Sequence, residues 1–447
     1  MKKAIIHASL CLLPIAGISG QTAPGAPTGT LRTELFVTTA DSVHPYRIPA
    51  IARANDGTLI AVSDYRPCNS DIGYGRVDLV SRLSHDGGRT WTPETAIRRG
   101  TGVAGASDCG FGDAAIVADN RSNEVLLVSV CGNTPYFSAT RDNPNRVSRW
   151  RSHDGGRTWS SGEEITESIY SIFDKSRMGA VKSLFFGSGR ICQSRIVKRG
   201  KYFRLYAALA ARDGGNRVIY SDDFGESWNS LGSIDMSPVP KGDEPKCEEF
   251  PDGSVIVSSR TYGGRFFNIF RYSDVKRGLG TWGSAAFSSE KNNGTAAAGN
   301  ACNGEILVVP AKRTADGAPT YLLLQSVPFG PGRTCVGIYY KEIDDRSIMR
   351  DPSALAADWD GKYQVTRLPS AYSTMTTFPN GDLAFFYEET THGKDYTNVF
   401  VRLDIATITQ GRYTSCPKAS RKAFLRNLEK AARTGKSNGK VTTKIRK

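Results

Sequence analysis

The eight-residue stretch Ser84–Trp91, which reads SHDGGRTW, decides the fold because it recurs along the chain. Ser152–Trp159 repeats the same eight letters, and Ser221–Trp228 reads SDDFGESW, so that the pattern S-x-D-x-G-x-[ST]-W returns after 68 and then 69 residues. A degenerate fourth copy ends at Trp282, and Trp359 is a candidate for closing a fifth. A constant spacing of this kind indicates a repeat architecture.

The chemistry of the octet is that of a turn between two strands. Its aspartate can accept N–H groups across the turn, its glycine supplies a positive φ, and its tryptophan provides an apolar wedge between neighbouring units. A calcium loop is the competing interpretation, but the octet lacks the acids at alternate positions that an EF-hand loop needs. The octets are therefore predicted to be scaffold.

Strand-like segments fill the intervals between the octets, and strong helical periodicity is confined to the C-terminal tail. The clearest are TLIAVSDY, AAIVADN, EVLLVSVC, YFRLYAAL, SVIVSSR, GEILVVP, YLLLQSV and DLAFFYEE. They predict an all-β region from about Glu34 to Leu403, placed within a domain spanning residues 33–410. About 370 residues at about 65 per repeat predict a six-bladed β-propeller, in which four-stranded units stack around an axis.

The N-terminal segment 1–20 has the features of a secretory signal peptide. Lys2 and Lys3 precede a short apolar run, which Pro14 interrupts. We therefore expect a secreted or periplasmic protein. Eight cysteines remain after such a segment is removed; their even number permits disulfides, but their wide spacing leaves the pairing open, and no CxxC pair indicates a metal.

The formal net charge of +14 is concentrated at the C-terminus. Residues 418–447 contain eleven Lys or Arg residues and one acid, Glu429. This segment alone therefore contributes +10 to the net charge. We expect residues 411–447 to form a basic tail with a short helix at about 419–433 and a disordered end, solvated in the simplest interpretation. Contact with an acidic polymer or an anionic surface is the alternative.

The octet resembles the Asp-box of sialidases, and the chain carries a second feature of that family, YRIP at Tyr46–Pro49. Asp-boxes alone are not decisive, because non-catalytic propellers also use them. The resemblance covers essentially all of the chain between the signal segment and the tail. It implies a sialidase-type propeller that acts as a retaining exo-α-sialidase (neuraminidase), a glycoside hydrolase releasing terminal sialic acid from glycoproteins, glycolipids and oligosaccharides.

Three arginines match the family's carboxylate-binding set. Sialic acid carries a carboxylate on its anomeric carbon, which guanidinium groups match in charge and planar geometry. The resemblance assigns this role to Arg47 in YRIP, Arg260 at the end of CEEFPDGSVIVSSR, and Arg333 in VPFGPGRTC. Glu244 stands sixteen residues before the second of these arginines, as the family pattern requires.

The resemblance also implies the catalytic residues. A carboxylate nucleophile would be repelled by the substrate's own carboxylate, and sialidases are the recognised exception among retaining glycosidases in using tyrosine. Tyr372 in PSAYSTM matches this nucleophile and Glu244 its partner base, which the phenol needs because its ordinary pKa is about 10. Asp71, which follows Arg47 by 24 residues, matches the acid that protonates the leaving group.

Further residues match supporting positions of the family. Arg66 in SDYRP and Asp113 in GFGDAA match positions that contact the sugar. Glu388 in FFYEE matches a carboxylate that holds the first arginine, with its neighbour Glu389 as a possible error of register. Cysteines at 68 and 109 lie close in sequence to two of these acids, which suggests a disulfide bracing the acid loop.

No pattern typical of a metal site, a nucleotide-binding loop or a Ser-His-Asp triad competes with this interpretation, so we expect no cofactor and no nucleic-acid partner. The expected partners are sialylated glycans, including mucin-type glycoproteins and gangliosides, bound by a monomer. Two alternatives remain. A non-catalytic sialoglycan-binding propeller would be expected to lack Tyr372, Glu244 or Asp71, and a trans-sialidase would keep all three but transfer the sugar.

Overall fold

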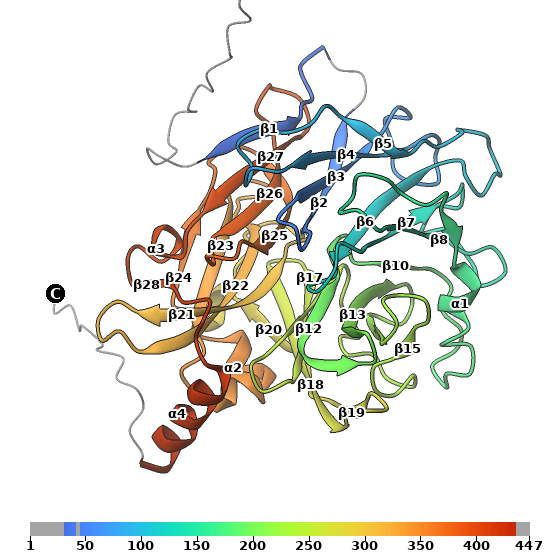
Figure 1. Ribbon diagram of the computed structural model, residues 1–447. Helices are drawn as coiled ribbons and strands as arrows, with labels where there is room; N and C mark the ends of the chain where they lie inside the picture. Colours follow the sequence, from blue (N-terminus) through green and yellow to red (C-terminus); the bar gives the residue numbers. More distant parts are fainter. Residues whose placement is uncertain (1–30, 42–44, 435–447) are drawn as a thin grey trace, which may run out of the picture.

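The computed structural model describes residues 31–41 and 45–434, and the predicted signal peptide lies outside the described residues. Six sheets of four or five strands, antiparallel except for one parallel pair, are arranged around a common centre (Figure 1). The predicted six-bladed β-propeller is therefore confirmed.

The sheets follow one another in chain order. The first contains β2 (Tyr46–Arg53), β3 (Leu59–Tyr65), β4 (Asp78–Ser84) and β5 (Thr95–Arg98). The second contains β6 (Phe111–Ala118), β7 (Val125–Cys131), β8 (Arg146–Ser152), β9 (Glu163–Glu164) and, in parallel with β6, β11 (Gly189–Arg190). The third contains β10 (Leu184–Phe186), β12 (Cys192–Arg199), β13 (Tyr202–Ala211), β14 (Arg217–Ser221) and β15 (Asn229–Ser230).

The second half of the chain continues the pattern. The fourth sheet contains β16 (Pro245–Glu249), β17 (Val255–Thr261), β18 (Gly264–Asp274), β19 (Leu279–Trp282) and β20 (Ala286–Ser289). The fifth contains β21 (Ile306–Arg313), β22 (Pro319–Pro328), β23 (Val336–Glu342), β24 (Gly361–Gln364) and β28 (Tyr413–Ser415). The sixth contains β25 (Ser370–Thr377), β26 (Leu383–Glu389), β27 (Thr397–Leu403) and β1 (Arg32–Phe36).

The ring is closed by pairing the two ends of the chain. The N-terminal strand β1 completes the sixth sheet by pairing with β27, about 365 residues further along. Each sheet then buries its faces against both neighbours, and a separate apolar cluster fills each of the six interfaces. Because one sheet cannot bury both of its faces alone, the blades depend on each other for stability.

The octet turns have the geometry that their sequence predicts. In the first copy Asp86 accepts the N–H groups of Arg89 and Thr90, at 3.0 and 2.9 Å, and Gly87 and Gly88 have φ of 76° and 94°. The tryptophan of the third copy, Trp228, is buried in the cluster between the second and third sheets. Trp91, Trp159 and Trp228 lie in the connections β4–β5, β8–β9 and β14–β15. The two degenerate positions are equivalent: Trp282 is the last residue of β19, and Trp359 lies between β23 and β24.

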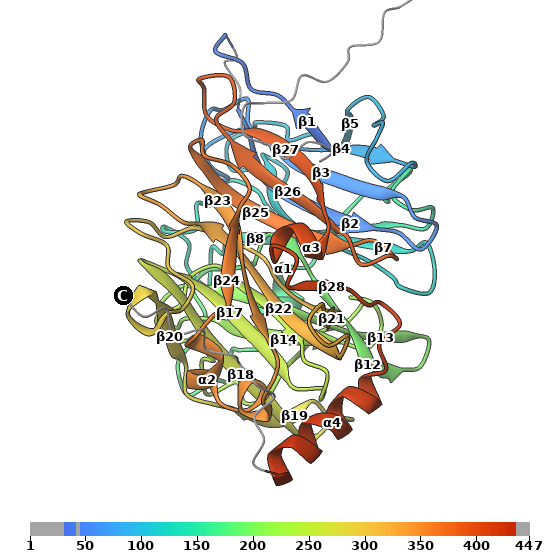
Figure 2. The same cartoon turned by 90° about the vertical axis from the view of Figure 1, so that its left-hand side faces the viewer.

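The C-terminal segment differs from the expected solvated tail. Strand β28 lies beyond the predicted domain limit at residue 410 and pairs with β21. The predicted helix is present as α4 (Arg421–Thr434), and its side chains Phe424 and Leu428 are buried against the fifth sheet. An apolar stripe on a basic helix explains this docking, because leaving two large side chains in water would cost free energy. Figures 1 and 2 show α4 at the periphery of the propeller. The disordered end proposed beyond residue 434 lies outside the described residues.

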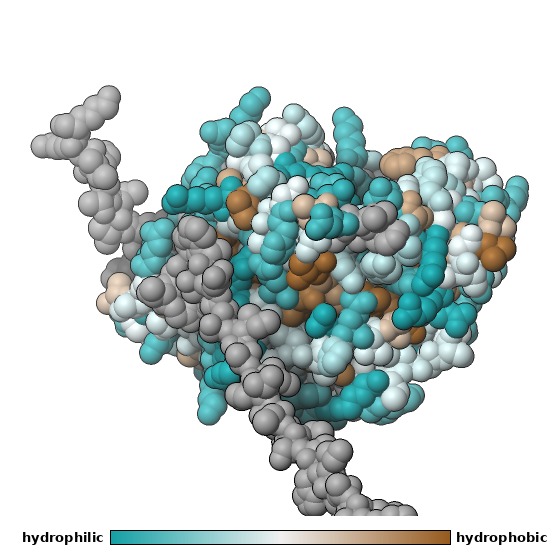
Figure 3. All heavy atoms as spheres, turned by 90° about the horizontal axis from the view of Figure 1, so that it is seen from above, coloured by the Kyte–Doolittle hydropathy of each residue, from teal (hydrophilic) through white to brown (hydrophobic). Residues whose placement is uncertain are grey.

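The remaining helices are short. They are α1 (Thr166–Tyr170), η1 (Glu290–Asn292), η2 (Arg346–Met349), α2 (Pro352–Ala356) and α3 (Ile405–Ile408). Within the described residues, no helix has the length and apolar character needed to cross a membrane. The face seen in Figure 3 is mostly hydrophilic, with apolar residues in small patches.

Candidate active site

The sequence-predicted residues converge on one cavity at the end of the propeller where the inner strands β2, β6 and β25 begin. Its volume is about 280 Å³. Eight of the nine predicted site residues line it: Arg47, Arg66, Asp71, Asp113, Glu244, Arg260, Arg333 and Tyr372. The ninth, Glu388, lies directly behind them on β26.

β-Bulges on the inner strands aim three of these side chains. The pairing register shifts between Arg47 and Ala50 in β2, within the segment 112–115 of β6, and within the segment 370–373 of β25. Ile48, in the first of these bulges, has a φ of 56°, a left-handed conformation that β-branched residues rarely adopt. Bulges re-aim side chains, and strain of this type is typical of functional sites.

Tyr372 forms a closed hydrogen-bonded group with an acid and an arginine. Its hydroxyl donates to Glu244 Oε1 at 2.6 Å and accepts from Arg260 Nη1 at 3.0 Å. The same arginine nitrogen lies 2.9 Å from Glu244 Oε2. Burial, followed by the charge of Glu244, raises the pKa of Tyr372 well above its ordinary value. The phenol is therefore protonated at neutral pH, with its proton directed at a carboxylate.

Three guanidinium groups surround this tyrosine, and they differ in their partners. Arg47 and Arg333 lie 5.5 and 5.6 Å from the centre of the Tyr372 ring. The first is paired with Glu388, and Arg260 is paired with Glu244. Arg333 has no acid within 4.0 Å among the described residues, and its guanidinium donates to the carbonyl of Ala301 over a long distance of 3.4 Å. The cavity thus keeps positive charge available for an anion.

Glu388 joins the first arginine to the tyrosine. It is fully buried, and its oxygens accept from Arg47 Nε at 2.8 Å, from the Ile48 amide at 2.7 Å and from the Tyr372 amide at 3.0 Å. Its neighbour Glu389 instead accepts from Arg32 and Tyr387, away from the cavity. The register chosen from the sequence, with Glu388 facing the first arginine, agrees with this geometry.

A second cluster lies across the cavity around the buried Arg66. Its guanidinium lies 2.9 Å from Asp64, 3.1 Å from Asp71 and 3.8 Å from Asp113. The Asp71 side chain is 66% exposed and faces the open end of the cavity. Burial and the charges of the two other carboxylates raise the pKa of Asp113 well above its ordinary value.

The loop that carries Asp71 is not held by a disulfide. Cys68 and Cys109 are both free thiols, as are the other six described cysteines, so the hypothesis of a 68–109 disulfide is wrong for this structure. The loop is held by Arg66 and by Asn133, whose side chain donates to the Gly73 carbonyl at 2.9 Å. Polar contacts therefore replace the expected covalent brace.

Sequence reasoning missed several residues of the site. Asp64 holds Arg66, and its place two residues earlier on the same strand face could have signalled it. Tyr396 lies under the Arg47 guanidinium at 4.8 Å, and Asp243 lies 3.2 Å from Arg260. Further lining residues come from the 130–145 segment and from β10, and no sequence pattern marked them: Val130, Pro135, Tyr136, Phe137, Asn145 and Phe185.

The fold and the site define a class of protein: a six-bladed propeller whose mouth holds a tyrosine–glutamate pair within a ring of arginines, facing an exposed aspartate. This arrangement can bind a small carboxylate, deliver a phenolic oxygen to it, and exchange a proton on the opposite side. Within the described residues, no group of three or more His, Cys, Asp and Glu side chains is placed to hold a metal ion.

Comparisons with known proteins agree with this class. The chain is 25% identical over 400 residues to a sialidase of Micromonospora viridifaciens, a match covering 86% of this chain and 56% of that protein. It is 26% identical over 356 residues to a sialidase of Clostridium perfringens, covering 77% of this chain and 86% of the relative. No protein-family profile matches the chain.

Among solved structures, the fold resembles the intramolecular trans-sialidase of Ruminococcus gnavus, solved with oseltamivir carboxylate. The TM-score is 0.62 at 16% identity, and the match covers 84% of this chain and 98% of that structure. The chain spans about half the length of the Micromonospora protein, so what the relatives do is carried over to this chain only as a proposal.

Proposed function

We propose that the protein is a retaining exo-α-sialidase that hydrolyses terminal sialic acid from glycoconjugates through a covalent sialyl-tyrosine. The observation that carries this proposal is the 2.6 Å hydrogen bond from Tyr372 to Glu244 inside a group of three arginines. The similarity to sialidases of two bacteria supports the substrate class.

In this proposal Arg47, Arg260 and Arg333 bind the sialic acid carboxylate. The first two are oriented by buried acids, and the third brings an unpaired positive charge. Fixed guanidinium groups recognise a carboxylate by charge and by planar geometry together. Arg66 and Asp113, across the cavity, contact polar groups of the sugar away from the reacting carbon.

The chemistry proceeds in two steps. Tyr372 Oη attacks the anomeric carbon as its proton moves to Glu244, while Asp71 gives a proton to the departing glycosidic oxygen. Asp71 then removes a proton from water, which attacks the same carbon and releases the tyrosine, whose proton returns from Glu244. Two displacements retain the configuration.

The substrates in this proposal are sialylated glycoproteins, glycolipids and oligosaccharides, acted on by a monomer exported by its N-terminal segment. No step of the mechanism uses a cofactor. N-terminal sequencing and light scattering of the secreted protein test the export and the oligomeric state.

The decisive experiment compares the protein with Tyr372→Phe on a fluorogenic α-sialoside. Loss of the nucleophilic oxygen is expected to lower kcat at least about 10³-fold without unfolding the protein. Tyr363→Phe, on the outer strand β24 and away from the cavity, is the matched control and is expected to keep full activity. Equal activity of both variants would contradict the tyrosine mechanism, and an inactive parent protein would favour a non-catalytic sialoglycan-binding module.

A trans-sialidase is the second candidate, favoured by the fold match to the Ruminococcus gnavus enzyme. Both activities share the sialyl-tyrosine and differ only in what attacks it. Mass spectrometry of the product separates them: free sialic acid indicates hydrolysis, 2,7-anhydro sugar indicates intramolecular transfer, and a new sialoside with added acceptor indicates intermolecular transfer.

A further inference from the structure

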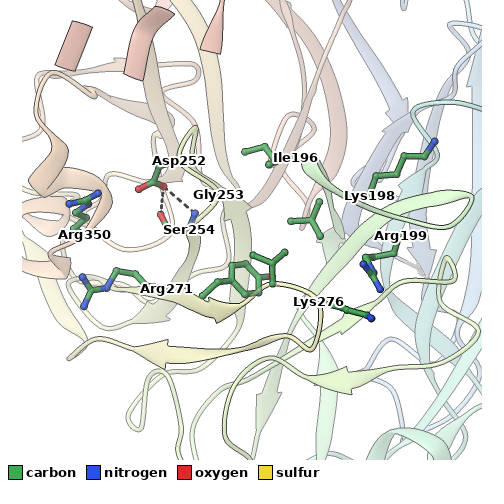
Figure 4. Close-up of a pocket in the computed structure, with 12 residues that line it drawn as sticks. Ile196, Lys198, Arg199, Asp252, Gly253, Ser254, Arg271, Lys276 and Arg350 are labelled. Atoms are coloured by element: carbon green, nitrogen blue, oxygen red, sulfur yellow. Dashed lines mark hydrogen bonds between the residues drawn. The ribbon is translucent and has the colours of Figure 1, made fainter. Parts of the chain in front are cut away.

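A second and larger hollow lies at the other end of the fourth sheet, and no step of the proposed reaction uses it. Its volume is about 820 Å³. The turn Asp252–Ser254, the end of β12 and the turn after β18 line it (Figure 4). Glu244 and Arg260 of the catalytic cavity lie at the opposite end of the same β16–β17 hairpin. A five-residue hairpin is about 17 Å long, so the two sites open on opposite faces of the propeller.

The charge around this hollow is strongly unbalanced. Five cationic side chains line it and only one acid does; the cations are Lys198, Arg199, Arg271, Lys276 and Arg350. None of the five has an acid within 4.0 Å among the described residues, unlike the paired arginines of the catalytic cavity. The acid, Asp252, accepts from the amide and hydroxyl of Ser254, and no cation of the described part of the chain pairs with it. We call this feature the basic hollow.

The cations stand in two groups on opposite sides. Figure 4 shows Arg271 and Arg350 on one side, and Lys198, Arg199 and Lys276 on the other. Ile196 lies between the two groups (Figure 4), and the lining also includes the apolar side chains of Val197 and Val275. Two separated positive groups match a ligand that carries several negative charges along its length better than a single carboxylate or phosphate.

Helix α4 extends the same positive surface. Arg421 donates to the carbonyl of Pro251, the residue before Asp252, and Glu429 pairs with Arg346 close to Arg350. The helix also carries the exposed cations Lys422 and Arg426. The docked tail therefore adds its charge beside the basic hollow.

We propose that the basic hollow and α4 together bind a linear anionic polysaccharide, carboxylated or sulfated, as a non-catalytic anchoring site. This rests on the proposed function for its purpose, because glycoconjugates rich in sialic acid present many negative charges. A single-stranded nucleic acid fits less well, since bases need exposed aromatic faces. The one aromatic residue of the lining, Tyr272, is bonded through its hydroxyl to Tyr206 and packs edge-on against Phe270.

The test uses heparin, a polysulfated glycan that lacks sialic acid and is therefore not a substrate of the proposed reaction. We compare the full chain with the triple variant Arg271→Gln, Lys276→Gln, Arg350→Gln. The matched control, Lys175→Gln, Lys291→Gln, Lys394→Gln, removes three exposed lysines that line neither cavity. The hollow triple is expected to bind heparin at least about tenfold more weakly than the parent, and the control within about twofold.

Two further measurements make the result specific. The double variant Lys198→Gln, Lys276→Gln, which changes only the group of cations that contains the two lysines, is expected to weaken binding as well. Turnover of the fluorogenic α-sialoside is expected to be unchanged in every variant, so an inactive parent contradicts the proposed function without touching the anchoring site. Equal heparin binding by both triples overturns the proposal, as does competition by a single-stranded oligonucleotide at the same charge concentration as heparin.

Discussion

The catalytic cavity and the basic hollow are both lined by arginines, but the two sites differ in whether carboxylates pair with these positive charges. In the cavity, Arg47 and Arg66 sit in a largely buried setting and are held by the carboxylates of Glu388 and Asp64. In the hollow, Arg271 and Arg350 are exposed and have no acidic partner among the described residues. Paired charges are fixed in direction, whereas unpaired exposed charges act over distance and respond to salt. The propeller thus carries two kinds of positive site. In one the arginines are held in a fixed orientation, and in the other exposed cations attract a ligand through their net charge.

The largest difference between the two sites is expected when one acid is removed from each of them. Glu388→Ala is expected to lower the free energy of unfolding by about 3–5 kcal/mol, because it leaves the partly buried Arg47 and the buried amides of Ile48 and Tyr372 without their acceptor. Asp252→Ala at the hollow is expected to cost at most about 1 kcal/mol, since its partners are the uncharged amide and hydroxyl of Ser254 in the same turn. Urea denaturation of both variants measures the difference; equal losses would mean that the buried pairing does not distinguish the sites.

The exposed acid of the cavity provides the next test. Asp71→Asn is expected to slow hydrolysis of a sialyllactose by about 10²–10⁴-fold, because the leaving oxygen is no longer protonated. An aryl sialoside with an acidic phenol leaving group needs little protonation and is expected to lose much less. Steady-state kinetics on the two substrates give the ratio, and a uniform loss on both would remove Asp71 from the role of acid.

The buried acids predict a dependence of stability on pH. The pKa of Asp113 is raised in the folded protein, so the folded state keeps a proton that the unfolded chain loses as the pH rises above about 4. The wild type therefore loses stability relative to Asp113→Asn as the pH increases, by about 1.4 kcal/mol for each unit by which the pKa is raised. Melting temperatures of both proteins at pH 4.5 and pH 7.5 check the sign. A melting temperature of the variant that falls relative to the wild type between pH 4.5 and pH 7.5 would contradict it.

The smallest expected effect is that of salt. Raising the salt from about 0.05 to about 0.3 M shortens the screening length from about 14 to about 6 Å and weakens exposed charges more than buried ones. The KM for a sialylated mucin is expected to rise about threefold, while the KM for the aryl sialoside changes little. The hollow triple variant is expected to lose most of this salt dependence, and a parallel change for both substrates would mean that screening acts at the catalytic cavity instead.

Much of the fold followed from local signals. The octets at Ser84 and Ser152 form the expected turns because their hydrogen bonds join residues three or four positions apart. The site was predicted one residue at a time from motif contexts, and all nine residues come together although Arg47 and Glu388 are 341 positions apart. What escaped prediction were mainly contacts between residues far apart in sequence, such as Tyr396 under Arg47 and Asp243 beside Arg260.

The sequence by itself determined the repeat, the number of blades and the types of residue available for chemistry, because turns and alternating strands depend on neighbours along the chain. Only the tertiary structure decided how they combine. The bulges that aim Arg47 and Tyr372, the docking of α4 through Phe424, and the five unpaired cations of the basic hollow all depend on the closure of the ring. That closure joins β1 to β27, and such a long-range pairing leaves no periodic trace in either segment.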